Sequence, residues 1–165
     1  MKVLVAGIGN IFFGDDGFGP AVARELAGDA FPGVKVEDYG IRGMHLAYEL
    51  TSGYDKAFLI DAVPGGGVPG TLYLVEPGSP ARETVPDAHR MDLENVFGFL
   101  RVIGGEAPPI TLVGCEPAKT DDGIGLSQPV LAAVAPAADL VRRLLTETLA
   151  ASQCAQKGDP ICSEA

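Results

Sequence analysis

Three short apolar segments constrain the fold of this chain more than any other feature. They are KVLVAG at residues 2–7, KAFLIDAV at 56–63 and ITLVGC at 110–115. A nearly continuous apolar run is typical of a strand in a parallel sheet, because helices cover such a strand on both faces. We therefore expect these three segments to lie at the centre of one β-sheet.

Two further strands and four helices are expected around these segments. They are strands at 34–39 and 70–76, helices with apolar stripes that include Phe18 and Val22, Met44 and Leu50, and Leu93 and Phe97, and a last helix at about 127–150. The alternation predicts the α/β class, as a three-layer α/β/α sandwich with a twisted, mostly parallel five-stranded sheet. The turn at 64–71 is too short for a helical crossover, so the strand after it is expected to run antiparallel to the strand before it.

The composition fits a single domain. The chain has 165 residues, of which 47% are hydrophobic, and this is enough for one sizeable core. We expect the domain to occupy residues 1–150. Residues 151–165 carry too little apolar surface to offset the entropy of ordering them, so a disordered tail is expected there.

An excess of acidic residues argues against two classes of partner. The chain has 12 Lys and Arg against 22 Asp and Glu, so no basic stripe is expected for nucleic acid or for an anionic membrane. No segment has the roughly 20 apolar residues that span a bilayer, and the first residues lack the features of a signal peptide. We expect a cytoplasmic protein that is a monomer.

The glycine-rich stretch after the first strand, GIGNIFFGDDGFGP at 7–20, resembles a nucleotide-binding turn only in part. Gly7 and Gly9 fit the first two positions of a GxGxxG motif, but Phe12 occupies the third. The carboxylates of Asp15 and Asp16 would repel a phosphate at the helix start. Asp38 ends the second strand and is compatible with ribose binding, so a Rossmann-like nucleotide-binding protein remains an alternative.

The acidic pair also has two other interpretations. One carboxylate is enough to cap a helix, and a divalent cation would offset the repulsion between two. Asp61 near the end of the third strand and His89 in the loop before the third helix are expected at the same sheet edge, where α/β proteins bind ligands. Two carboxylates and one imidazole suit nickel, zinc or manganese better than calcium. These residues alone leave open which aspartate binds the metal.

The remaining candidate side chains are expected to take no direct part in chemistry. His45 lies in a helical segment and is expected to be exposed or to support the site from behind. Cys115 lies in an apolar run, which favours a buried, protonated thiol. Cys154 and Cys162 lie in the polar tail, where a regulatory disulfide between them is an alternative.

Several motifs, in the same order along nearly all of residues 1–150, resemble the hydrogenase maturation proteases. They are LVAGIGNIFFGDDGFG, YGIRGMHLAYEL, LIDAV, PGTLYLVEP, AHRMDLENVFGFLR, and TLVGCEP followed by GLSQPV. This resemblance implies an endopeptidase that removes the C-terminal extension of a nickel-iron hydrogenase large-subunit precursor after nickel insertion. It implies that the precursor is the partner and that nickel is met in the precursor, with another divalent metal as the alternative cofactor.

The resemblance also implies the site residues. The metal-binding residues of the family fall on Asp16, Asp61 and His89 of this chain. Asp16 or Asp61 is then expected to be the catalytic base of an aspartic-type or metal-assisted peptidase, and Asp15 is expected to be a helix cap. A non-catalytic nickel-sensing chaperone with the same three residues is the competing function.

One loop departs from the family pattern. Family members often carry a Gly-Thr pair before a Gly-Met pair, and this chain has Gly40, Ile41 and Arg42 there. The loop is linked in the family to substrate selection, so the resemblance does not indicate which hydrogenase is the substrate.

Overall fold

A computed structural model describes the backbone of residues 1–76 and 90–157 and the side chains of residues 1–76 and 96–154. Its sheet consists of β1 (Val3–Ile8), β2 (Val34–Gly40), β3 (Lys56–Ala62), β4 (Leu72–Val75) and β5 (Ile110–Cys115). Its helices are the 3-10 turn η1 (Gly14–Gly17), α1 (Phe18–Leu26), α2 (Gly43–Leu50), α3 (Arg90–Ile103) and α4 (Gln128–Lys157). No helix in the described part of the chain is long and apolar enough to cross a membrane.

The strand order confirms the expected sheet. The order is β2-β1-β3-β5-β4, so the three apolar segments form its centre. The pairs β1 with β2, β1 with β3, and β3 with β5 are parallel. β4 runs opposite to β3, as the short turn predicts, but it hydrogen-bonds to β5 and forms the edge of the sheet.

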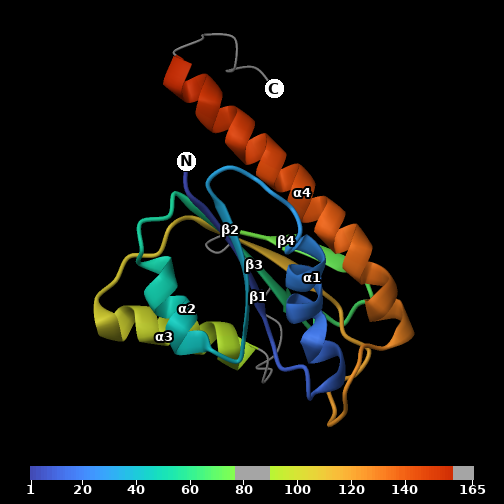
Figure 1. The fold of residues 1–165 in the computed structure, drawn as a ribbon. Helices are drawn as coiled ribbons and strands as arrows, with labels where there is room; N and C mark the ends of the chain where they lie inside the picture. The colour runs from blue at the N-terminus through green and yellow to red at the C-terminus, as the bar shows by residue number, and fades with distance from the viewer. Residues whose placement is uncertain (77–89, 158–165) are drawn as a thin grey trace.

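Helices cover both faces of the sheet, so the expected three-layer α/β/α architecture is confirmed. Figure 1 shows α1 and α4 on one side of the strands and α2 and α3 on the other. Successive residues of a strand point to opposite faces. Val3 and Val5 of β1 accordingly pack in the core under α1 and α4, and Leu4 and Ala6 pack in the core under α2 and α3.

The last helix is longer than expected. α4 continues to Lys157, so the prediction of a disordered tail is wrong for residues 151–157, and residues 158–165 lie outside the described part. Five of the seven added residues are Ala, Gln or Lys, which favour helix, and extending an existing helix carries no nucleation cost. Figure 1 shows this end of α4 projecting beyond the sheet.

Two glycines allow α1 to lie directly on the sheet. A Cβ atom at Gly19 would overlap the carbonyl oxygens of Ile8 and Ile60, and one at Gly7 would overlap the carbonyl oxygen of Gly19. The start of α1 is therefore fixed against the C-terminal ends of β1 and β3. The turn η1, which carries both aspartates and precedes α1, lies at that same edge.

Candidate active site

Asp16 is held in a tight loop between β1 and α1. Its side chain is only 4% exposed, and its Oδ2 accepts a hydrogen bond from the N–H of Asn10 at 2.7 Å. Gly9 has a φ of 128° and no room for a Cβ beside the Asp16 carbonyl, so only glycine fits there. The close approach that Gly9 permits is therefore made by the loop that carries Asp16.

Asp61 lies at the C-terminal end of β3, as predicted. It is 2% exposed, and its Oδ1 accepts a hydrogen bond from the N–H of Ala62 at 2.8 Å. η1 lies against β3, so Asp16 and Asp61 lie at the same edge of the sheet. The chain leaves β1 toward β2 on one side and reaches β3 on the other, which makes the space between β1 and β3 the topological switch point, where α/β proteins bind ligands.

The predicted metal-binding group lies only partly within the described residues. His89, the third predicted ligand, lies outside the described residues, and no group of three possible metal-binding side chains occurs among the residues the structure does describe. Two buried carboxylates at one edge supply the hard oxygen donors that a divalent cation prefers. Asp16 and Asp61 therefore fit the predicted site, and the role of His89 stays a prediction.

The prediction that Asp15 caps its own helix is wrong. Neither η1 nor α1 has a side-chain cap, and the fully buried Asp15 carboxylate turns to a distant loop. Its Oδ2 accepts hydrogen bonds from the N–H groups of Ala118 at 2.8 Å and Lys119 at 3.0 Å and from the hydroxyl of Ser127 at 2.9 Å. Its Oδ1 accepts the N–H of Ser127 at 2.6 Å, immediately before α4.

These hydrogen bonds keep Asp15 charged. Burial alone would raise the pKa of its carboxyl, but the donors of Ser127, Lys119 and Ala118 together lower that pKa below its ordinary value. Asp15 thus joins the loop of Asp16 to the start of α4. The sequence carried no signal for this contact, because the donors lie more than 100 residues away along the chain.

Glu116 is a further buried carboxylate near the site, and sequence reasoning missed it. It follows β5, is 5% exposed, and accepts hydrogen bonds from the N–H groups of Gly65 and Gly66 at 2.8 and 3.2 Å and from the hydroxyl of Tyr73 at 2.7 Å. Burial alone would raise its pKa, but these donors lower it. Glu116 therefore fixes the loop that follows Asp61. An acidic residue directly after an apolar strand was the available signal.

Cys115 is unreactive, as predicted. Its side chain is fully buried, and burial raises the pKa of its thiol to about 11. The thiol is protonated at neutral pH and is a poor nucleophile. Cys162 lies outside the described residues, so the disulfide with Cys154 stays an untested alternative.

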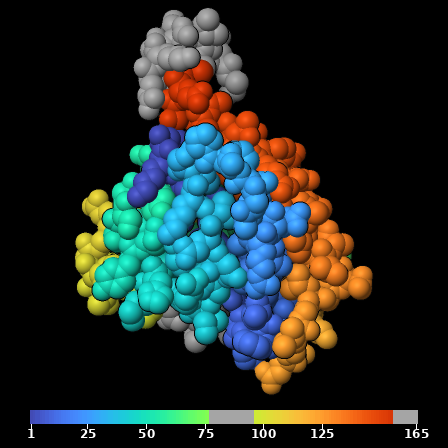
Figure 2. Space-filling view, viewed as in Figure 1, coloured from blue at the N-terminus to red at the C-terminus, as the bar shows by residue number. Residues whose placement is uncertain are grey.

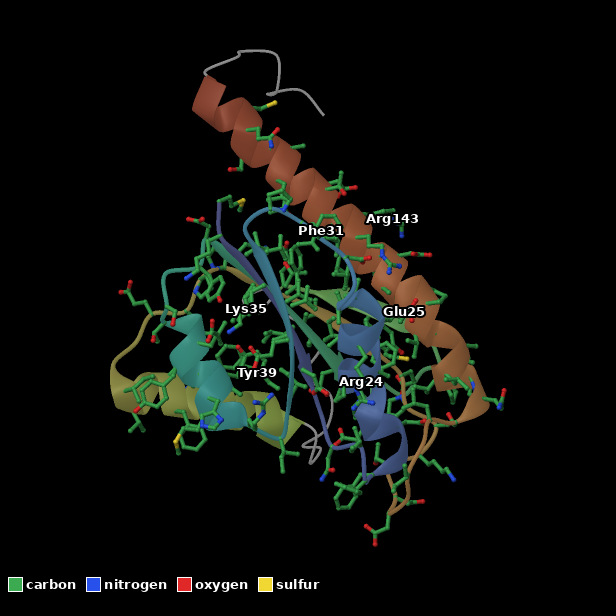
Figure 3. All side chains as sticks on the ribbon, viewed as in Figure 1. Arg24, Glu25, Phe31, Lys35, Tyr39 and Arg143 are labelled. Atoms are coloured by element: carbon green, nitrogen blue, oxygen red, sulfur yellow. The ribbon has the colours of Figure 1, made fainter. Side chains whose placement is uncertain are left out.

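The structure gives no support to the nucleotide alternative. The N–H groups of Gly14 and Asp15, at the turn where a phosphate would bind, donate to the carbonyls of Gly123 and Lys119 at 2.8 and 3.1 Å. Asp38, the candidate ribose ligand, lies 3.4 Å from the guanidinium of Arg24, which lies on α1 next to β2 (Figure 3). The donors and the acid that a dinucleotide would require already have partners within the protein.

A pocket of about 370 Å³ opens beside the site, where β1 and β2 end and α2 begins. Its lining includes Ile8, Gly40, Ile41, Met44, His45 and Phe99. His45 is exposed, as predicted, and Ile41 is 72% exposed. The loop at 40–42, whose sequence differs from the family pattern, therefore forms one wall of a largely apolar pocket.

Known proteins resemble this chain over most of its length. A family model described as hydrogenase maturation protease matches residues 20–144, a span that includes Asp61 and follows Asp16. The protein HupD of Bradyrhizobium diazoefficiens is 36% identical over 88% of this chain and 79% of its own. The hydrogenase 2 maturation protease of Escherichia coli K12 is 31% identical over 90% and 93%.

Solved structures agree with the fold. The hydrogenase maturating endopeptidase HybD from Escherichia coli superposes with a TM-score of 0.76 at 29% identity, over 90% of this chain and 94% of that one. The hydrogenase 2 maturation peptidase from a Thaumarchaeota archaeon has a TM-score of 0.67 at 35% identity, over 88% and 99%. The fold, the order of motifs and these matches establish a peptidase of hydrogenase maturation. The chain belongs to the hydrogenase maturation protease family.

Proposed function

We propose that this protein removes the C-terminal extension from the large-subunit precursor of a nickel-iron hydrogenase after nickel has been inserted. The observation that carries the proposal is the pair of buried carboxylates, Asp16 and Asp61, at the switch point of the sheet. Nickel is here a part of the substrate. The carboxylates meet the metal and the peptide bond together when the precursor docks.

The two carboxylates suit this task because the backbone orients them. The N–H of Asn10 binds one oxygen of Asp16, and the N–H of Ala62 binds one oxygen of Asp61. Asp16 lies in η1 and Asp61 lies in β3, and their hydrogen bonds hold both side chains before substrate binds. Little conformational freedom is therefore lost on binding. His89 is the proposed nitrogen ligand, and with the two aspartates it would form a set of donors that suits nickel.

Hydrolysis needs a base, and the buried acids near the site differ in their fitness for that role. Donors within the protein already bind the carboxylates of Asp15 and Glu116, so neither carboxylate is offered to a water molecule as a base. We assign the base to Asp16 or Asp61: it takes a proton from water as the water oxygen bonds to the scissile carbonyl carbon. The same proton then passes to the leaving amine nitrogen as the carbon–nitrogen bond breaks.

The surface around this edge suits a protein substrate. Phe12 is 60% exposed, Ile41 72% and Met44 52%, and such apolar groups are typical of surfaces that bind proteins. Figure 2 shows the α2 segment and the loop after β1 at the same end of the molecule, opposite the end where α4 projects. The pocket beside Ile41 is the proposed site for an apolar side chain of the precursor.

The test is direct incubation with nickel-loaded precursor, followed by mass spectrometry of the large subunit. The parental protein should shorten the precursor by one C-terminal peptide, and an Asp16→Asn variant should not. Stable binding of the precursor without any loss of mass would contradict the proposal and favour the non-catalytic chaperone.

A further inference from the structure

We infer that Asp15 is a positioning residue for this reaction: its carboxylate locks a second loop onto the loop of Asp16 and thereby holds Asp16 in its working place. The kinetic part of this inference rests on the proposed function. The structural part stands on the contacts of Asp15 alone.

The second loop, residues 117–127, is bound to the loop at 10–17 by more than the Asp15 side chain. The backbone N–H of Asp15 donates to the carbonyl of Lys119 at 3.1 Å, and that of Gly14 donates to Gly123 at 2.8 Å. The N–H of Gly123 donates back to Phe12 at 2.8 Å. We call these two segments the two-loop unit, and Figure 1 shows the first, in blue before α1, beside the second, in orange before α4.

The Asp15 carboxylate is the polar centre of this unit. Four donors of the second loop converge on its two oxygens, and it is fully buried. An amide in its place offers one accepting oxygen and points an N–H₂ group at N–H donors. At least one buried backbone donor then loses its partner, which the unit avoids only by opening.

A shift of Asp15 must reach Asp16, because the two residues are consecutive in η1. Asp16 is tied to the same loop by two contacts: its N–H donates to the carbonyl of Phe13 at 3.1 Å, and its carboxylate binds the N–H of Asn10. The Asn10 amide therefore reports whether the Asp16 carboxylate is in place.

The chain supplies a control variant at the other end of α1. Asp29, just after α1, binds the guanidinium of Arg142 in α4 at 2.8 Å. Asp15 and Asp29 both tie the first βα unit to the α4 segment, but Asp29 does so at the end of α1 that lies away from η1. Asp29→Asn thus weakens a more exposed link between the same two segments without touching the two-loop unit.

The kinetic experiment compares Asp15→Asn with Asp29→Asn on nickel-loaded precursor, at a temperature where both are fully folded. Because misplacement of a catalytic group by about 1 Å costs on the order of 100-fold, Asp15→Asn should lower kcat by about that factor. KM should stay within about threefold, because the docking surface is unchanged. An unchanged kcat, or an equal loss in Asp29→Asn, would overturn the inference.

The structural experiment needs no substrate. Amide hydrogen exchange by NMR should be about tenfold faster at Asn10 in Asp15→Asn and unchanged in Asp29→Asn. Unchanged exchange at Asn10 in Asp15→Asn would overturn the inference whatever the activity. If the parental protein fails to cleave precursor, the proposed function fails, and exchange at Asn10 still decides the role of Asp15.

A milder pair of variants covers the case in which Asp15→Asn does not fold. Ser127→Ala removes only the hydroxyl donor to Asp15, and Ser127→Thr keeps it. We expect Ser127→Ala to lose about fivefold in kcat, as one hydrogen bond of about 1 kcal/mol implies, and Ser127→Thr to restore it. Equal kcat in the two variants would overturn the inference.

Discussion

The two faces of the sheet differ in how tightly they are packed. One face lies under α1 and α4, and the other lies under α2 and α3. On the first face, Gly19 brings the backbone of α1 onto the carbonyls of Ile8 and Ile60. The α4 segment is then tied to the first βα unit at both ends of α1, through Asp15 and through Asp29. This face combines close backbone packing at Gly19 with polar links to α4, of which that of Asp15 is fully buried.

The second face is more open at the same edge. α2 buries Leu46, Ala47 and Leu50 but leaves Met44 52% exposed beside a pocket of about 370 Å³. The wall at Ile41 is exposed as well. We expect that these exposed side chains can be substituted without disturbing the packed core.

The difference separates two tasks. Asp16 lies on the tightly packed face under α1 and α4, which we call the rigid face, where several contacts fix its position. The proposed recognition surface lies on the face under α2 and α3, which we call the open face. Substitutions on the rigid face should therefore change the rate of cleavage or the stability of the fold. Substitutions on the open face should change which precursor binds.

The largest effect is expected at the edge that both faces share. Asp61→Asn should lower precursor processing by about 10²- to 10⁴-fold, the usual contribution of a catalytic acid or base, and should keep the fold. Asp55→Asn is the matched control, because Asp55 binds the N–H of Lys2 at the opposite end of the same strand. Mass spectrometry of the product over time checks both variants. Equal activity of the two would show that Asp61 takes no part in the reaction.

The next effect separates the two faces by stability. Gly19→Ala should lower the free energy of unfolding by about 1–3 kcal/mol, because the added methyl overlaps backbone atoms. Gly98→Ala in α3 meets no atom within 4 Å and should raise stability by about 0.5–1 kcal/mol through helix propensity. Urea denaturation measures both, and similar values would show that the two faces are equally tolerant.

A smaller effect tests recognition on the open face. Ile41→Ser should raise KM for the precursor about fivefold, as loss of about 1 kcal/mol of apolar contact implies, with kcat unchanged. Val102→Ser is the control, because Val102 is 82% exposed and does not line the pocket. A fall in kcat without a change in KM would place Ile41 in the chemistry instead.

The smallest effect concerns pH. Glu116 has a folded-state pKa below its ordinary value of 4.5, so its contribution to stability is complete above that pH and is lost as pH falls through the folded value. Glu116→Gln should therefore differ most from the parental protein near neutral pH and differ less below pH 4.5. Urea midpoints across this range check the sign. Asp15 behaves in the same way, so the variant should keep part of the acid sensitivity.

Local patterns in the sequence predicted what depends on local physics. The apolar runs predicted the three central strands, and the strand ends predicted that the Asp15–Asp16 pair and Asp61 lie at one edge of the sheet. The choice of Asp16 as the site residue came from the family resemblance. Contacts between segments that are far apart in the sequence could not be predicted from it. Asp15 was assigned to its own helix because its donors lie 103 to 112 residues away, and the pairing of β4 with β5 depends on the closed sheet. His89 was predicted from its motif and lies outside the described residues.

The dependence of cleavage on nickel tests the central claim most directly. One precursor preparation is divided into nickel-loaded and nickel-free halves, each is incubated with the protein, and the mass of the large subunit is measured. The account predicts loss of a C-terminal peptide in the loaded half alone. Equal cleavage in both halves would contradict it.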